Sequence, residues 1–314
     1  TDGGYLLVGE SESGAEGDRT EASRGDEDFW VVKIDANGNK IWDKRFGGTE
    51  RDACYSVVAS SDGGYLLAGI SFSAANGDKS EGTRGGSDYW VVKIDANGTM
   101  LWEKTYGSGL DDVCNDALEL PNGNIILAGY SNSAAWAEKS HNSKGKSDFW
   151  LVEIDENGTK LWDKTLGGSQ FDYCSDVIVT PENGFILAGQ SGSWISGDKT
   201  EDRIGDYDYW VVKIDSQGNK VWDRTFGGSD TEYFDSIAAS DDGGYLLAGS
   251  SYSQSGHNVT DANRGIKDFW VVKIDASGNV SLVSGNGNWG DDVGDKNSAS
   301  YQHPQTLAFD SAGN

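Results

Sequence analysis

The chain has 314 residues, of which 51 are acidic and 25 basic, so its formal net charge is −26. A surface this negative repels phosphate backbones and anionic lipid headgroups, which argues against nucleic acid and membranes as partners. Aromatic residues make up 11% of the chain and include 12 tryptophans. No run of about 18 apolar residues occurs, so nothing predicts a transmembrane helix or membrane insertion. The composition indicates a folded acidic protein.

Two motifs recur along the chain with a spacing of 60 residues. One is an aliphatic segment that ends in glycine, as in GGYLLAG at 63–69, and the other is an acid–aromatic–tryptophan segment, as in DYWVVKID at 88–95. Self-similarity at a fixed period of this length predicts a repeat architecture. The second motif places an acid and a tryptophan at structural repeat positions in five copies: Asp28 and Trp30, Asp88 and Trp90, Asp148 and Trp150, Asp208 and Trp210, and Asp268 and Trp270.

One copy contains four segments with strand character, at 52–60, 64–71, 88–95 and 100–106. Asp-Gly and Asn-Gly pairs stand between the first two and between the last two, and such pairs are strong hairpin signals because their turns need positive φ. No segment shows a 3.6-residue apolar period. Each copy is therefore predicted to be a four-stranded antiparallel meander.

The composition of the four segments predicts their order in space. The first is rich in small residues and suits a crowded inner position. The second and third are almost wholly apolar, as expected for a sheet that is covered on both faces. The fourth carries Glu103 and Lys104 beside Trp102, and charges on an outer strand discourage edge-to-edge pairing. We therefore expect an all-β fold, a β-propeller of four-stranded blades, five of them visible, with the repeated tryptophans in the core.

Two further repeat positions have structural interpretations. The acid that begins each third strand, such as Asp88, can accept backbone N–H bonds from the adjoining loop. Cys54, Cys114 and Cys174 share one repeat position, where the fourth copy has Phe234. Replacement by phenylalanine favours a buried apolar site over a disulfide or a metal site.

These motifs resemble the bacterial secreted β-propeller (SBBP-type) repeat. The resemblance rests on SDGGYLLAG, DYWVVKIDANG and IWDKRFGGTERD and covers about residues 1–280. It extends to large Bacteroidetes-type extracellular repeat proteins. It implies a non-catalytic protein that is extracellular or on the bacterial cell surface.

The repeat pattern breaks after residue 280, so we expect two regions, the propeller repeats at 1–280 and a divergent glycine-rich segment at 281–314. The end of this segment resembles the start of an NHL-type propeller repeat. Both ends of the sequence look cut within a blade, which predicts that the chain is part of a longer one. The alternative is that TLAFDSAGN closes a ring against the first copy.

Enzyme motifs find no support. The three histidines lie at unrelated places, which gives no triad or metal cluster, and GNGNWG at 285–290 lacks the strand–helix context of a dinucleotide site. We expect no catalytic residue, no metal and no cofactor. The alternative class is a propeller-type carbohydrate-active enzyme, a glycosidase or a lyase, which would need converging acids or histidines on one face.

The long loops between the second and third strands are the candidate binding face, because loops on a rigid scaffold commonly carry function. Asp18–Arg24 and Asp78–Arg84 pairs within a loop would simply stiffen it. Trp136 and Trp194 break the repeat and lie in these loops, where each could bind a partner or tuck under its own loop. With Lys139, His141 and Lys199 they form the candidate site for an acidic glycan or a partner protein.

Overall fold

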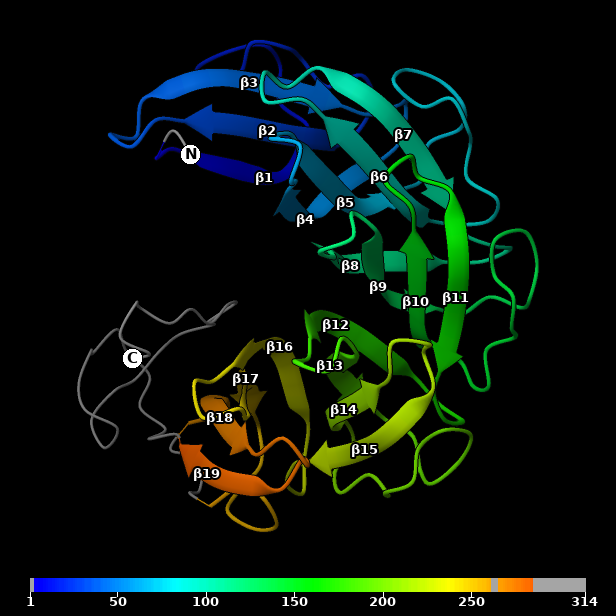
Figure 1. Ribbon diagram of the computed structural model, residues 1–314, viewed down its shortest axis with the longest axis vertical. Coiled ribbons are helices and arrows are strands. Elements are labelled where there is room, and N and C mark those ends of the chain that lie inside the picture. The colour runs from blue at the N-terminus through cyan, green and yellow to red at the C-terminus, as the bar shows by residue number, and fades with distance from the viewer. Residues whose placement is uncertain (1–2, 261–264, 285–314) are drawn as a thin grey trace. The chain divides into compact units, whose positions relative to one another are not determined.

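The computed structural model describes residues 3–260 and 265–284 (Figure 1). These residues form strands, turns and loops, and they include no helix. The chain divides into two compact units, Thr1–Ser143 with Trp150–Thr165 and Lys144–Phe149 with Leu166–Asn314, which we call the first and the second unit.

Strands that follow one another in the sequence pair in the same order, so each sheet is an antiparallel meander, as Figure 1 shows. The first sheet contains β1 (Tyr5–Ser11), β2 (Asp28–Ile34) and β3 (Lys40–Phe46). The second contains β4 (Asp52–Ala59), β5 (Tyr65–Ser71), β6 (Asp88–Ile94) and β7 (Met100–Tyr106). The third contains β8 (Asp112–Glu119), β9 (Ile125–Ser131), β10 (Asp148–Ile154) and β11 (Lys160–Leu166). The fourth contains β12 (Asp172–Val179), β13 (Phe185–Ser191), β14 (Asp208–Ile214) and β15 (Lys220–Phe226). The fifth contains β16 (Glu232–Ala239), β17 (Tyr245–Ser251), β18 (Asp268–Ile274) and β19 (Val280–Ser284).

The turn between the third and fourth strands is set by an aspartate and a glycine. In the second sheet, Asp95 Oδ1 accepts the backbone N–H groups of Asn97 and Thr99, each at 2.8 Å. Gly98 has a φ of 79°, which a residue with a side chain rarely adopts. Asp35 and Asp215 make the same contacts in their own copies. The Asn-Gly signal therefore predicts this hairpin correctly.

A β-bulge in the first strand of the full sheets explains the glycine that ends the aliphatic motif. In the second sheet the register between β4 and β5 shifts between Cys54 and Ser56. The carbonyl oxygen of Ala53 then approaches Gly69 so closely that a Cβ there would lie 1.9 Å from it. Only glycine fits this position opposite the bulge.

Within each unit, neighbouring four-stranded sheets contact each other through their first strands. In the first unit, Ser56 on β4 donates its hydroxyl to Asp116 Oδ1 on β8 at 2.9 Å. In the second unit, Ser236 on β16 makes the equivalent contact with Asp176 on β12 at 3.0 Å. The same polar contact therefore recurs between strands of adjacent copies in both units.

The repeated tryptophans join each sheet to the one before it. Trp90 on β6 packs against Phe29 on β2 with ring centroids 4.7 Å apart, and Trp270 on β18 packs against Tyr209 on β14 at the same distance. Trp90, Trp150, Trp210 and Trp270 are buried, whereas Trp30 in the first sheet is partly exposed. A buried tryptophan removes about 150–250 Å² from water, so each of these contacts buries a large apolar area between sheets.

The cysteine position is a buried apolar site, as the sequence predicts. Cys54, Cys114 and Cys174 are buried thiols, and Phe234 occupies the equivalent place against Tyr209 at 5.2 Å between ring centroids. Burial raises the pKa of the Cys54 thiol to about 12, so this thiol stays protonated at neutral pH.

Repeated four-stranded meanders with covered central strands confirm the predicted architecture of β-propeller blades. β19 begins at Val280, so residues assigned to the divergent segment form the fourth strand of the fifth sheet. Residues 285–314, with the NHL-like motif and the ring-closing alternative, lie outside the described part of the chain.

Candidate functional site

The long loops connect the second and third strands of each four-stranded sheet, and β1 and β2 in the three-stranded first sheet, and repeated contacts fasten them to the blades. The acid that begins each third strand accepts the backbone N–H of the residue four positions earlier. Arg24 donates to Asp28 at 2.7 Å, Arg84 to Asp88 at 2.7 Å, and Lys144 to Asp148. Ile204 donates to Asp208 in the same way. These carboxylates hold the end of each loop against the sheet.

An acid on the outer strand fastens the middle of the loop. Glu103 on β7 is buried, and its carboxylate accepts the indole N–H of Trp90 and the backbone N–H of Ser80, each at 2.8 Å. Asp163 and Asp223 make the equivalent contacts in the next two copies. The prediction that Glu103 is an outward charge protecting a strand edge is therefore wrong. It is an interior acceptor that couples a core tryptophan to the loop.

A buried cation lies under each of four loops. Lys79 donates its ammonium to the Thr105 hydroxyl at 3.0 Å, and its Nζ lies 4.8 Å from the centre of a Trp90 ring. Burial lowers its pKa to about 8, although Asp52, Glu103 and Asp88 nearby favour the charged form. The positions 60 residues apart hold Arg19, Lys139, Lys199 and Val259, all buried.

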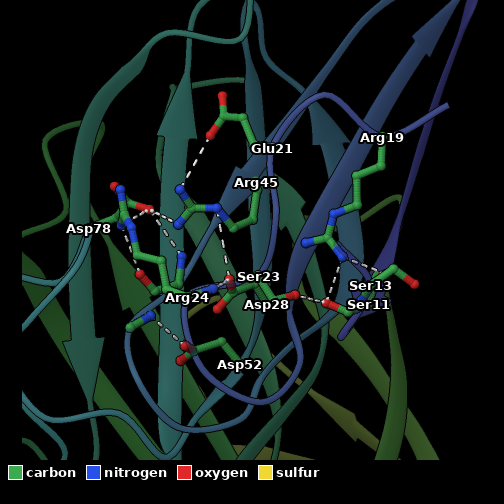
Figure 2. A network of polar contacts seen from close by, with 12 residues as sticks. Ser11, Ser13, Arg19, Glu21, Ser23, Arg24, Asp28, Arg45, Asp52 and Asp78 are labelled. Carbon is green, nitrogen blue, oxygen red and sulfur yellow. Dashed lines mark hydrogen bonds and ion pairs between the residues drawn. The ribbon is translucent and has the colours of Figure 1, made fainter. Parts of the chain in front are cut away.

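Ion pairs join neighbouring loops within each unit. Arg24 in the first loop pairs with Asp78 in the second loop at 2.5 Å, and Arg45 from β3 reaches the same carboxylate at 3.4 Å (Figure 2). Arg84 pairs with Glu138 in the next loop at 2.9 Å. In the second unit, Lys144 pairs with Asp198. Arg24 and Arg84 therefore engage acids of the following copy, and the predicted pairing of Asp18 with Arg24 and of Asp78 with Arg84 is not what the structure shows.

The buried carboxylates under the loops have raised pKa values. Burial raises the pKa of Asp28 to about 6 and that of Asp88 to about 7, and the charge of Asp112 adds to the shift at Asp88. Burial likewise raises the pKa of Asp112 to about 6. These groups are fully buried, so their titration affects stability and not chemistry at the surface.

Trp136 and Trp194 are exposed, at 59% and 51% of their surface. The Trp136 ring lies beside Gly109, and the guanidinium of Arg203 lies over the Trp194 ring at 4.4 Å. His141 is also exposed. Neither tryptophan is tucked beneath its own loop. Trp136 lies in the first unit and Trp194 in the second.

Lys139 and Lys199 are placed differently from the other candidate residues. Each is only 2% exposed. Lys139 donates to the Thr165 hydroxyl at 2.7 Å, and Lys199 donates to the Thr225 hydroxyl. Both belong to the buried cation position, so their ammonium groups fasten the loops and do not face a ligand at the surface. The sequence contains a signal for this burial, because Lys139 and Lys199 align with Lys79 in the repeat. A residue type that recurs at one repeat position more often serves the scaffold that all copies share.

Two general properties complete the description. Among the described residues, no cluster of three or more histidine, cysteine or acidic side chains has the arrangement of a metal site. A helix long and apolar enough to cross a membrane is likewise absent from residues 3–260 and 265–284.

Comparisons with known proteins give distant likenesses. No family model matches the chain. It is 22% identical over 228 residues to the regulatory protein FlaEY of Caulobacter vibrioides, a match that covers 68% of this chain and 24% of that protein. The chain thus spans about a quarter of this relative's length.

Among solved structures, the chain resembles Kuenenia stuttgartiensis hydrazine synthase, with a TM-score of 0.49, 14% identity, and coverage of 82% of this chain and 62% of that one. It also resembles the Pan2 WD40 domain of Neurospora crassa, with a TM-score of 0.49, 12% identity, and coverage of 84% and 60%. A Bacteroides caccae protein of unknown function aligns with a TM-score of 0.41, 13% identity, and coverage of 88% and 93%. At these values the likenesses assign no function, and the fold rests on the sheet topology of this chain.

Proposed function

We propose that the chain is a non-catalytic binding module that presents its long loops to a glycan or protein partner. The observation that carries the proposal is the pair of exposed tryptophans, Trp136 and Trp194, on loops whose ends and middles are fastened to the sheets. Large aromatic side chains that are held rigidly at a surface are typical anchors of binding sites, because little conformational freedom is lost on association.

The SBBP-type resemblance supports a bacterial extracellular or cell-surface location for this module, within a longer protein. The same resemblance supports a non-catalytic role. The perturbed acids also fit it, since Asp88 and Asp112 are wholly buried and could not reach a substrate at the loop surface.

The experiment compares the double variant Trp136→Ala/Trp194→Ala with wild type on a glycan array and in pull-downs from bacterial surface extracts. Binding should be lost while the melting temperature stays close to that of wild type, because both side chains are exposed. Leu101→Ala is the matched control, since it removes an exposed apolar side chain from the outer strand β7. Survival of binding in the double variant, or absence of any ligand for wild type, would leave the long loops without a role in binding.

A further inference from the structure

One edge of the first sheet is unpaired in the described part of the chain. This sheet has the order β1-β2-β3, whereas each of the other four sheets has a further strand beside the strand equivalent to β1. We call the unpaired side of β1, Tyr5–Ser11, the open edge. The backbone N–H and C=O groups along such an edge can pair with an added strand. The residues beside the edge indicate which kind of strand it accepts.

Gly9 leaves room for the backbone of an incoming strand. In the four-stranded sheets the glycine at this repeat position lies against a carbonyl oxygen of the bulged first strand, and a Cβ there would be between 1.9 and 2.1 Å from that oxygen. These glycines are Gly69, Gly129, Gly189 and Gly249. At Gly9 nothing in the described part of the chain lies within 4 Å of a Cβ. The space opposite Gly9 therefore suits the carbonyl oxygen of a bulged strand.

Arg19, beside the open edge, has donors that lack an acceptor. It is only 5% exposed, and its Nη1 donates to the Ser11 carbonyl at 3.0 Å and to the Ser11 hydroxyl at 2.6 Å (Figure 2). Its Nε and Nη2 are buried and have no hydrogen-bond partner among the described residues. The charges of Asp28 and Asp43 act on Arg19, but neither acid accepts from Nε or Nη2. Buried cationic N–H groups without an acceptor are costly, so this site favours a ligand that brings an acid.

The other copies show which acid belongs at this place. In three of them the cation at the Arg19 repeat position interacts with the charge of the acid that begins the first strand of the same sheet. These pairs are Lys79 and Asp52, Lys139 and Asp112, and Lys199 and Asp172. The same acids accept the hydroxyl of a serine just after the second strand, as Asp52 does from Ser73 at 2.9 Å. Ser13 is the equivalent serine of the first copy, and it is exposed. The sheet that lacks a first strand thus keeps both groups that hold its acid.

From these sites we infer that the open edge binds, as a fourth strand, a segment of the first-strand type from a repeat of this kind. The segment begins with an aspartate or a glutamate, which accepts from Arg19 and Ser13, and its bulge places a carbonyl oxygen against Gly9. The strands β4, β8, β12 and β16 have this chemistry, but each already pairs within its own sheet. The occupant is therefore a further strand of that type, held by backbone pairing with β1. This inference is independent of the loop tryptophans.

Two other occupants fit less well. Aligning Gly313 with Gly123 puts Gln302 at the acid position and Pro304 at the cysteine position. The chain's own segment at 302–309 would therefore bring no charge to Arg19, and its proline has no N–H for the ladder. A second copy would offer its own β1, which begins with a tyrosine where the first strands begin with an acid.

The test titrates the full chain with a fluorescent peptide of residues 47–60, which contains the β4 sequence and its acid, and measures anisotropy in reducing buffer. This peptide should bind, and a peptide of the same composition in scrambled order should not. Gly9→Ala should weaken binding by about tenfold or more, because its methyl group would meet the incoming carbonyl oxygen. Gly14→Ala is the matched control, since a Cβ there also has open space and lies outside the edge, and it should bind like wild type.

The acid is tested on the peptide, which leaves the folding of the chain untouched. Asp52→Asn in the peptide should weaken binding to wild type by about tenfold and binding to Arg19→Gln by much less, because both changes remove the same contact. A peptide of residues 301–314 should compete weakly.

Three outcomes concern the 47–60 peptide itself and would overturn the inference: no binding at about 1 mM, wild-type affinity in Gly9→Ala, or no effect of the Asp52→Asn change. Two others assign the edge to a different occupant and overturn it as well. Stronger binding of the 301–314 peptide would point to the chain's own segment, and a dimer that dissociates when the 47–60 peptide is added would point to a second copy.

Discussion

Replacing Asp88 by asparagine should make stability less dependent on pH. Asp88 Oδ2 accepts the Arg84 N–H at 2.7 Å, and Asp112 Oδ2 accepts the Ser108 N–H at 2.7 Å, while the Oδ1 atoms of both have no hydrogen-bond partner in the described part of the chain. The Asp112 N–H also donates to the Ser87 carbonyl at 2.7 Å, which brings the two carboxyl groups together. Two buried acids this close favour at least one protonated form.

The direction of the effect follows from the shifted pKa. Burial raises the pKa of Asp88 from 3.8 to about 7, so between these values the folded protein holds a proton that the unfolded chain releases. Stability contributed by this group is present in full below pH 4 and is lost as the pH rises through 7. From pH 5 to pH 7.5 the loss for Asp88 is about 2–3 kcal/mol. Lys79, whose pKa is lowered to about 8, is mostly protonated in both states across this window.

Urea melts at pH 5 and pH 7.5 measure this difference. The free energy of unfolding of wild type should be higher at pH 5 than at pH 7.5. In Asp88→Asn this difference between the two pH values should be smaller by about 2 kcal/mol, because a neutral amide replaces the titrating group. Asp95→Asn is the control, since hydrogen bonds from Thr99 lower the pKa of this partly exposed acid and it titrates below the window. A wild type equally stable at both pH values, or an Asp88→Asn variant with the wild-type difference, would refute the reasoning.

Two further variants test the packing. Gly69→Ala should destabilise by about 1–3 kcal/mol or more in urea melts, because its Cβ would meet the Ala53 carbonyl oxygen. Gly9→Ala is the control at the same repeat position in the three-stranded first sheet. It should cost much less, because nothing lies within 4 Å of a Cβ there. Trp90→Ala should cost about 3–5 kcal/mol, as expected for a buried ring, and Trp136→Ala under about 1 kcal/mol. Equal losses at the two tryptophans would mean that Trp136 contributes to a core.

The sequence predicts the sheets well because the signals that form them are local and repeated. Alternating turn signals and apolar segments define four strands per copy, and the Asp95–Gly98 turn forms through contacts among neighbouring residues. Glu103, Lys139 and Lys199 are predicted wrongly because hydropathy places charged residues outside, whereas all three are buried. Their burial depends on a loop that folds back over the outer strand, and no local pattern encodes that contact.

The candidate site is the part that the sequence predicts least. Exposure of Trp136 and Trp194 agrees with their departure from the repeat, but Lys139 follows the repeat and is buried with it.

The meander has a consequence for how such a gene can change. Each sheet takes all its strands from one consecutive stretch of chain, so the backbone ladder of a blade is complete within one 60-residue period. Unequal recombination between near-identical copies would therefore insert or remove whole blades without breaking a ladder. Insertions or deletions of other lengths would move the tryptophans and the glycines at the Gly69 repeat position out of the repeat register. Copy number is thus the easiest quantity for evolution to vary in this chain, and single positions within a copy are free to specialise.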